Sequence, residues 1–135
     1  MKRSVMLAGV SLSMLLAAAG GVASADGALQ GAWTMGGTGC EETFETVDGT
    51  VRFRNRDSSL NTGVIIRGDT MMGPNSTCGI GRITESKGLY KVHLSCASSI
   101  MFSDISVTLQ LVGNDHFRRV DPDFPEISRD YTRCM

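Results

Sequence analysis

The sequence predicts an all-β domain, most simply a small antiparallel up-and-down β-barrel of about eight to ten short strands, with a β-sandwich as the alternative. Three observations predict it. After residue 26, apolar and polar residues alternate in short runs separated by Gly, Asp, Asn and Pro, and no helical period is sustained. Turn-forming pairs divide these runs into hairpins. All four cysteines follow an N-terminal segment typical of exported proteins.

That segment predicts a bacterial signal peptide over residues 1–25. A basic start at Lys2 and Arg3 precedes an apolar run, and Ala23-Ser24-Ala25 has the small-x-small pattern that signal peptidase cuts. Cleavage would leave a single β-barrel domain over residues 26–135. We expect a periplasmic or secreted protein in which thiols oxidise.

Composition excludes some functions. Lys2 and Arg3 leave with the signal, so 13 basic residues fall to 11 against 14 acidic residues, and the mature net charge becomes −3. Nucleic-acid binding draws on clustered Lys and Arg, so we expect no nucleic-acid partner. The apolar run of the signal is shorter than the roughly 20 residues of a membrane-spanning helix, and no later run is longer, so we expect no membrane span.

The first predicted hairpin covers residues 41–56 and turns at Asp48-Gly49, a pair favoured where both turn positions need positive φ. Folding about this turn places Phe44 opposite Phe53. The pairs expected on the other face are Glu45 with Arg52, Thr43 with Arg54, and Glu41 with Arg56. The three arginines form either an anion-binding stripe or a solvated face neutralised by the glutamates, which is the interpretation we favour.

A second predicted hairpin covers residues 77–96 and turns within residues 85–88. Its register places Ile80 opposite Leu94 and Cys78 opposite Cys96 on the core side. Four cysteines permit three pairings. The hairpin register favours Cys78 with Cys96, which leaves Cys40 with Cys134 to join the first and last strands of a barrel. No Cys-x-x-Cys spacing supports a metal-binding or catalytic role.

The remaining strands are shorter. Residues 105–112 alternate cleanly, and residues 113–115 turn the chain into residues 116–120. Further strands are expected at residues 32–35, 63–67, 70–72 and 130–134. By composition, residues 97–103 and 121–129 are predicted loops that lie over an opening of the barrel.

The opening of the mature chain, Leu29-Gln30-Gly31-Ala32-Trp33, resembles that of the calycins, the lipocalin and avidin-like barrels. Leucine, Gly-x-Trp and a nearby cysteine are also similar to the start of the bacterial inhibitors of secreted metalloproteases. Those inhibitors have fewer cysteines, however, and lipocalins are usually longer. The resemblance implies that Trp33 plugs one end of the barrel and that Arg133, from a late strand, lies across its ring.

Few residues suggest a site. Met71, Met72, Met101 and Phe102 form either a soft apolar binding lip or core filling. His93 and His116 are expected on the surface, and nothing in the sequence pairs a nucleophile with a base. Residues Asp121, Asp123 and Glu126 form either a calcium site or, as we favour, a solvated acidic loop.

We therefore expect an exported binding module, without catalytic activity, cofactor or metal, that holds a small apolar molecule or an envelope component. The alternative is an inhibitor of a secreted protease or lysozyme whose N-terminal arm, residues 26–30, enters a cleft. An enzyme with a site hidden from the sequence is the third hypothesis.

Overall fold

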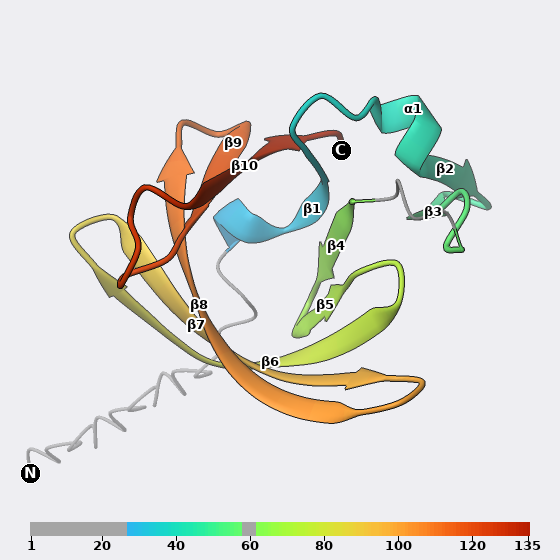
Figure 1. Cartoon of the computed structure of the whole chain (residues 1–135). Coiled ribbons are helices and arrows are strands. Elements are labelled where there is room, and N and C mark those ends of the chain that lie inside the picture. Colours follow the sequence, from blue (N-terminus) through green and yellow to red (C-terminus); the bar gives the residue numbers. More distant parts are fainter. Residues whose placement is uncertain (1–26, 58–61) are drawn as a thin grey trace, which may run out of the picture.

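Eight antiparallel strands close into a barrel in the computed structural model, which describes residues 27–57 and 62–135 (Figure 1). The predicted signal peptide lies outside the described residues. The barrel strands are β1 (Gly31–Met35), β4 (Val64–Arg67), β5 (Thr70–Met72), β6 (Ser76–Ser86), β7 (Leu89–Ser98), β8 (Phe102–Val112), β9 (His116–Val120) and β10 (Ser128–Arg133).

The strand order around the barrel follows the chain. From β4 to β10 each strand pairs with its successor, and β1 closes the ring by pairing with β10 on one side and β4 on the other. Trp33 lies in this seam, opposite Arg133 in β10 and Val64 in β4. The closed meander confirms the predicted up-and-down barrel and excludes the sandwich.

The hairpin between β1 and β4 forms a sheet of its own outside the barrel (Figure 1). Strands β2 (Phe44–Val47) and β3 (Thr50–Phe53) pair Phe44 with Phe53 and Glu45 with Arg52, as predicted. Asp48 and Gly49 have φ values of 51° and 76°, so both turn positions are in the left-handed region that the Asp-Gly pair favours.

The strand conformation expected at the outer end of that hairpin was predicted wrongly. Glu41 and Thr43 belong to a short helix, α1 (Cys40–Thr43), rather than to a strand. The hydroxyl of Thr43 donates a hydrogen bond of 2.9 Å to the Gly39 carbonyl within this turn. The Thr43 carbonyl accepts the Arg54 backbone N–H at 2.9 Å, so these two residues do meet across the hairpin as predicted. Arg54 still reaches across, and its Nε donates to the Glu41 carbonyl at 2.8 Å.

Two hydrophobic clusters hold the structure together. The larger fills the barrel and includes Trp33, Val92 and Leu94. The smaller lies on the outer wall, where Phe44 and Phe53 of the hairpin cover Ala32 and Ile65. Adjacent strand residues point to opposite faces, so Ala32 and Ile65 face the hairpin whereas their neighbours Trp33 and Ile66 face the interior.

The predicted register of the second hairpin holds only in the half that contains the two cysteines. Cys78 pairs with Cys96 and Ile80 with Leu94, as predicted. The register then shifts between Ile80 and Ile83, so that Ile83 lies opposite Val92. This β-bulge inserts one residue, and it lets the hairpin end on a two-residue turn, residues 87–88, instead of the expected four.

The predicted loop over residues 97–103 is also wrong at both ends. Strand β7 continues to Ser98 and β8 begins at Phe102, with Ala97 opposite Phe102. The Ser98 N–H donates to the Met101 carbonyl at 2.9 Å, which closes a tight turn and keeps both strands paired to their ends. The other predicted loop is shorter than expected, because Ser128 and Arg129 pair with β9 as part of β10.

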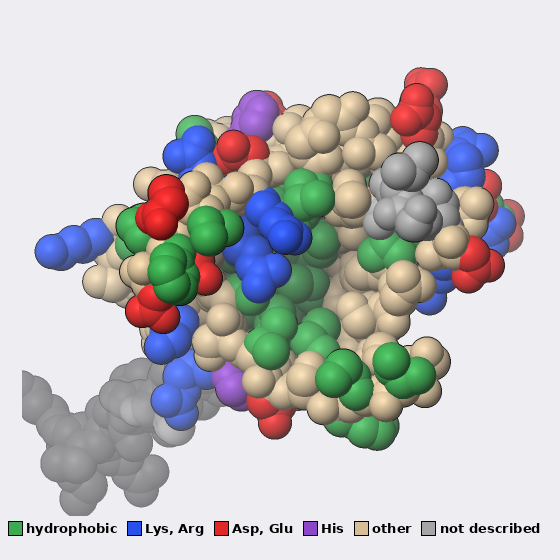
Figure 2. Space-filling view, in the orientation of Figure 1, with side chains coloured by type: hydrophobic (Ala, Val, Ile, Leu, Met, Phe, Trp, Pro, Cys, Tyr) green, Lys and Arg blue, Asp and Glu red, His purple; other side chains and the backbone are tan. Residues whose placement is uncertain are grey.

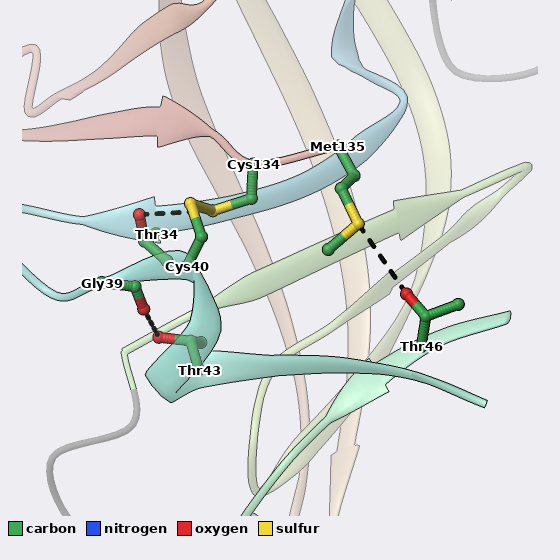
Figure 3. Close-up of a disulfide and its surroundings, with 7 residues drawn as sticks. All are labelled: Thr34, Gly39, Cys40, Thr43, Thr46, Cys134 and Met135. Carbon is green, nitrogen blue, oxygen red and sulfur yellow. Dashed lines mark hydrogen bonds between the residues drawn. A yellow bond between two sulfur atoms is a disulfide. The ribbon is translucent and has the colours of Figure 1, made fainter.

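Both predicted disulfides are confirmed. Cys78 and Cys96 face one another across β6 and β7 with their Cα atoms 3.9 Å apart. Cys40 and Cys134 join the start of α1 to the C-terminal end of the chain, with a Cα–Cα distance of 5.6 Å (Figure 3). The second bridge therefore fastens the outer hairpin to the β1–β10 seam. The described chain contains no free cysteine.

Candidate binding cavity

One end of the barrel is closed by Trp33. Its side chain is completely buried, and its indole Nε1 donates to the Leu29 carbonyl at 3.0 Å. Leu29 ends the short 3₁₀ helix η1 (Gly27–Leu29) and is itself buried beside the indole. The chain just before β1 therefore packs against the base of the barrel.

Arg133 lies across the Trp33 ring, which is the contact that the calycin resemblance implies. The guanidinium carbon is 4.1 Å from the ring centroid. The same guanidinium donates to the carbonyls of Asn114 at 2.9 Å and Ala28 at 2.7 Å, and to that of Gln30. These hydrogen bonds tie η1 and the β8–β9 turn to the last strand. The cation–π contact with Trp33 is worth about 0.5–2 kcal/mol more.

The glycine of the Gly-x-Trp motif is needed here for space and for backbone geometry. Gly31 has φ +128°, a conformation that other residues rarely adopt, and a Cβ at this position would lie 2.2 Å from the Met135 carbonyl oxygen. A side chain would therefore push the C-terminus away from β1.

Stacked aromatic rings separate the closed end from the cavity above it. Trp33 meets Phe117 edge-on with a centroid distance of 4.8 Å, and Phe117 stacks on Tyr131 at 4.6 Å. Phe117 and Tyr131 also line the cavity, so these two rings form its floor. Rings that pack on one another hold the floor in one arrangement.

A cavity of about 310 Å³ lies above this floor and opens at the end of the barrel opposite η1. Its walls are mainly apolar and include Val64, Met71, Leu94, Ile105, Val107 and Leu109. Figure 2 shows hydrophobic side chains at the bottom of a hollow on this face, with Lys and Arg side chains beside it. Apolar cavities of about 300 to 1,000 Å³ are typical of small-molecule sites.

The predicted binding lip divides between two faces. Met71 and Met101 line the cavity, as expected. Met72 instead packs on the outer cluster, because it follows Met71 in the same strand and so faces the other way. Phe102 is 88% exposed and is not part of the lining, so it does not belong to the lip either.

Sequence reasoning missed Arg119, the one charged residue among the described residues that line the cavity. It lies in β9 two residues after Phe117 and therefore shares the inward face. The alternation within residues 116–120 contained this information. Nothing in the sequence showed, however, which end of the barrel is open.

The described residues contain no grouping of three His, Cys, Asp or Glu side chains that could hold a metal ion. His93 lies on the outer wall, where its Nδ1 is 3.3 Å from the Ser106 hydroxyl, and His116 is exposed. The Asp121 carboxylate accepts the backbone N–H groups of Asp123 and Phe124 at 3.0 and 3.3 Å. This acidic residue therefore shapes its own turn.

The arginines of the outer hairpin all have partners within it. Arg52 Nε lies 2.7 Å from Glu45 Oε1, Arg54 bonds the Glu41 carbonyl, and the Arg56 guanidinium carbon is 5.7 Å from the Phe53 ring centroid. These contacts occupy all three guanidinium groups and so disfavour an anion-binding stripe, although among the described residues only Arg52 is neutralised by a glutamate carboxylate.

The N-terminal residues expected as a free arm are attached where the structure describes them. Leu29 is 1% exposed, and Arg133 binds the carbonyls of Ala28 and Gln30. Asp26 lies outside the described residues. The segment over residues 27–30 is thus part of the closed end of the barrel.

Comparisons with protein-family models, with curated proteins and with solved structures found no match to this chain. The class that the fold and the cavity define is a small disulfide-bonded antiparallel β-barrel with one plugged end and one open end. None of the helices in the described residues has the length and hydrophobicity that a membrane span requires.

Proposed function

We propose that this protein is a non-catalytic binding protein that holds a small, mainly apolar molecule in the open end of its barrel. The observation that carries the proposal is the cavity of about 310 Å³, whose walls are mainly apolar and whose floor is Phe117 and Tyr131. Burying apolar ligand surface there supplies the driving force for binding.

The framework around the cavity supports the same role. Cys78 and Cys96 both line the cavity and are bonded to each other, so β6 and β7 are cross-linked at the rim. A site that is already in its binding conformation loses less conformational entropy when a ligand enters. A cross-linked rim therefore favours affinity.

The proposal includes an exported location and a calycin-like ancestry. Two disulfides are typical of proteins that leave the cytosol, and the predicted signal is of bacterial type, so we place the protein in the periplasm or outside the cell. The Gly-x-Trp opening and the arginine over the tryptophan ring support a relationship to calycin barrels.

Titration of the mature protein with a series of straight-chain alcohols tests the proposal. Each added methylene should improve affinity about fourfold, the equivalent of roughly 0.8 kcal/mol, until the cavity is full. Ile105→Trp, which fills the cavity, should abolish this binding. Val112 belongs to the same strand but does not line the cavity, so Val112→Trp should leave the affinity for the alcohols unchanged. Equal affinity of the two variants would overturn the proposal.

A second candidate, inhibition of a secreted hydrolase, is favoured by the exposed tip of the β7–β8 hairpin. Ile100 and Phe102 are 89% and 88% exposed at this tip. Apolar side chains that protrude from a hairpin tip suit insertion into a partner's cleft, and the Cys78–Cys96 disulfide fastens β7 of this hairpin to β6. If this candidate is right, the protein inhibits a secreted protease or a lysozyme, and Ile100→Ser with Phe102→Ser removes the inhibition. Inhibition that survives both substitutions would contradict it.

A further inference from the structure

We propose that the ligand of this cavity carries an anionic head group, which Arg119 and Arg129 hold at the cavity mouth while its apolar tail fills the barrel. This inference rests on the proposed binding function and adds the chemical class of the ligand. It starts from the one charged side chain that lines the cavity, Arg119.

Arg119 and Arg129 are direct cross-strand partners in β9 and β10. Tyr131 and Phe117 are the next pair but one along the same two strands, so all four side chains share one face of the sheet. Phe117 and Tyr131 form the cavity floor. The two arginines therefore follow the floor toward the open end of the barrel.

The position between them shows the opposite arrangement. Arg118 and Asp130 are also direct partners, they point to the outer face, and their Nε and Oδ1 atoms are 2.7 Å apart. The same two strands thus carry a neutralised pair outside and two like charges inside. Like charges directly opposite one another destabilise a sheet. An anion between the guanidinium groups would remove that repulsion.

The surroundings leave room for such an anion. Arg119 and Arg129 line a second hollow of about 470 Å³ beside the loop after β9, and Val107 and Arg119 belong to both this hollow and the cavity. Lys91 adds a third positive charge, and Asp121 and Asp123 add two negative ones. Neither aspartate forms an ion pair with an arginine in the part of the chain that the structure describes.

Guanidinium groups select the head group by geometry. Their parallel N–H donors match two oxygens of one carboxylate, sulfate or phosphate, so two facing arginines can share a single anion. An apolar cavity next to such a pair fits an amphiphile, whose tail and head need different surroundings. Carboxylate and phosphate ester head groups share this chemistry, and the experiment separates them.

Isothermal titration of the mature protein with four decyl compounds tests the inference. Decanoate and decyl phosphate should bind more tightly than decanol, and decyltrimethylammonium should bind more weakly than decanol. Arg119→Gln and Arg129→Gln should each lower the affinity for the two anions about fivefold, and leave that for decanol unchanged, because only the anions contact the guanidinium groups. Arg118→Gln, the outward neighbour, is the matched control and should change none of the affinities.

The outcomes separate the two proposals. If all four compounds bind equally and both arginine variants behave as the wild type, the head-group inference fails and the binding cavity stands. If none binds, the proposed function fails, and the inference with it. If both anions bind, the ratio of the decanoate affinity to the decyl phosphate affinity identifies the head group that the arginine pair prefers.

Discussion

The two ends of the barrel are built from the same strands and differ in almost every other respect. At the closed end, Trp33 is fully buried, and the Arg133 guanidinium bonds three backbone carbonyls while lying over the indole. At the open end, Ile105 is 39% exposed, and Arg119 has no ion-pair partner in residues 27–57 and 62–135. The polar and aromatic groups of the closed end contact one another. The open end leaves an apolar side chain partly exposed and a guanidinium group without an ion-pair partner in the described chain. This difference indicates that the closed end provides stability and that the open end is available for a ligand.

The largest expected effect concerns the bridge that fastens the outer hairpin to the seam of the barrel. Replacing Cys40 and Cys134 with serine opens a loop of 94 residues, and the chain-entropy model gives a loss of about 4–5 kcal/mol. Replacing Cys78 and Cys96 opens a loop of only 18 residues, and the loss should be about 3 kcal/mol. Urea unfolding of both double variants measures the difference. A larger loss of unfolding free energy in the variant without Cys78 and Cys96 would contradict this expectation.

The second effect lies at the plug itself. Trp33→Ala should lower the free energy of unfolding by about 3–5 kcal/mol, because it empties the base of the barrel and leaves Arg133 without its aromatic partner. Ile105→Ala at the open end should cost less than 1 kcal/mol, since this side chain is partly solvated already. Equal losses, measured by urea unfolding, would show that the two ends contribute alike.

Arg133 allows a finer test of the closed end. Arg133→Lys keeps the positive charge but cannot reach three carbonyls with one planar group, so we expect a loss of about 1–2 kcal/mol. Arg119→Lys at the open end should change the free energy of unfolding by no more than about 0.5 kcal/mol. Thermal unfolding of the two variants side by side compares them, and a stability loss for the Arg119 variant that matches the Arg133 variant is the contrary result.

The smallest expected effect is on the exposed hairpin tip. Phe102→Ser should leave the free energy of unfolding within about 0.5 kcal/mol of the wild type, because the ring is 88% exposed. The same substitution should leave the affinity for decanol unchanged, since Phe102 does not line the cavity. Unfolding and titration of this variant provide both values, and a loss of decanol affinity would extend the cavity to the tip.

Local patterns were enough to predict most of the strands and the Cys78–Cys96 disulfide, which then left Cys40 to pair with Cys134. The Asp48-Gly49 turn and the Cys78–Cys96 register depend on neighbours within one hairpin, so short-range rules describe them. Helix α1 escaped prediction because its four residues are too few to show a helical period, and residues 41–43 run directly into the first strand of the hairpin. The Ser-rich residues 97–103 were predicted as a loop because composition does not show that β7 and β8 pair to their ends.

The candidate site was harder to predict than the fold. Met71 and Met72 look alike in the sequence, and only the register of β5 sends one into the cavity and the other to the outer cluster. Arg119 becomes informative only when β10 brings Arg129 opposite to it. The location of the opening depends on how η1 and Arg133 close the other end, which is a relationship between residues over a hundred positions apart.

We propose that the open end of the barrel, and not the closed end, takes an apolar ligand. NMR titration with decanol tests it most directly, because the chain has one tryptophan and therefore one indole N–H signal, buried at the closed end. We expect saturable shifts of the Leu94, Ile105 and Val107 methyl signals, with the Trp33 indole signal unmoved. Shifts confined to the outer-wall methyl group of Ile65, or no saturable shifts at all, would contradict it.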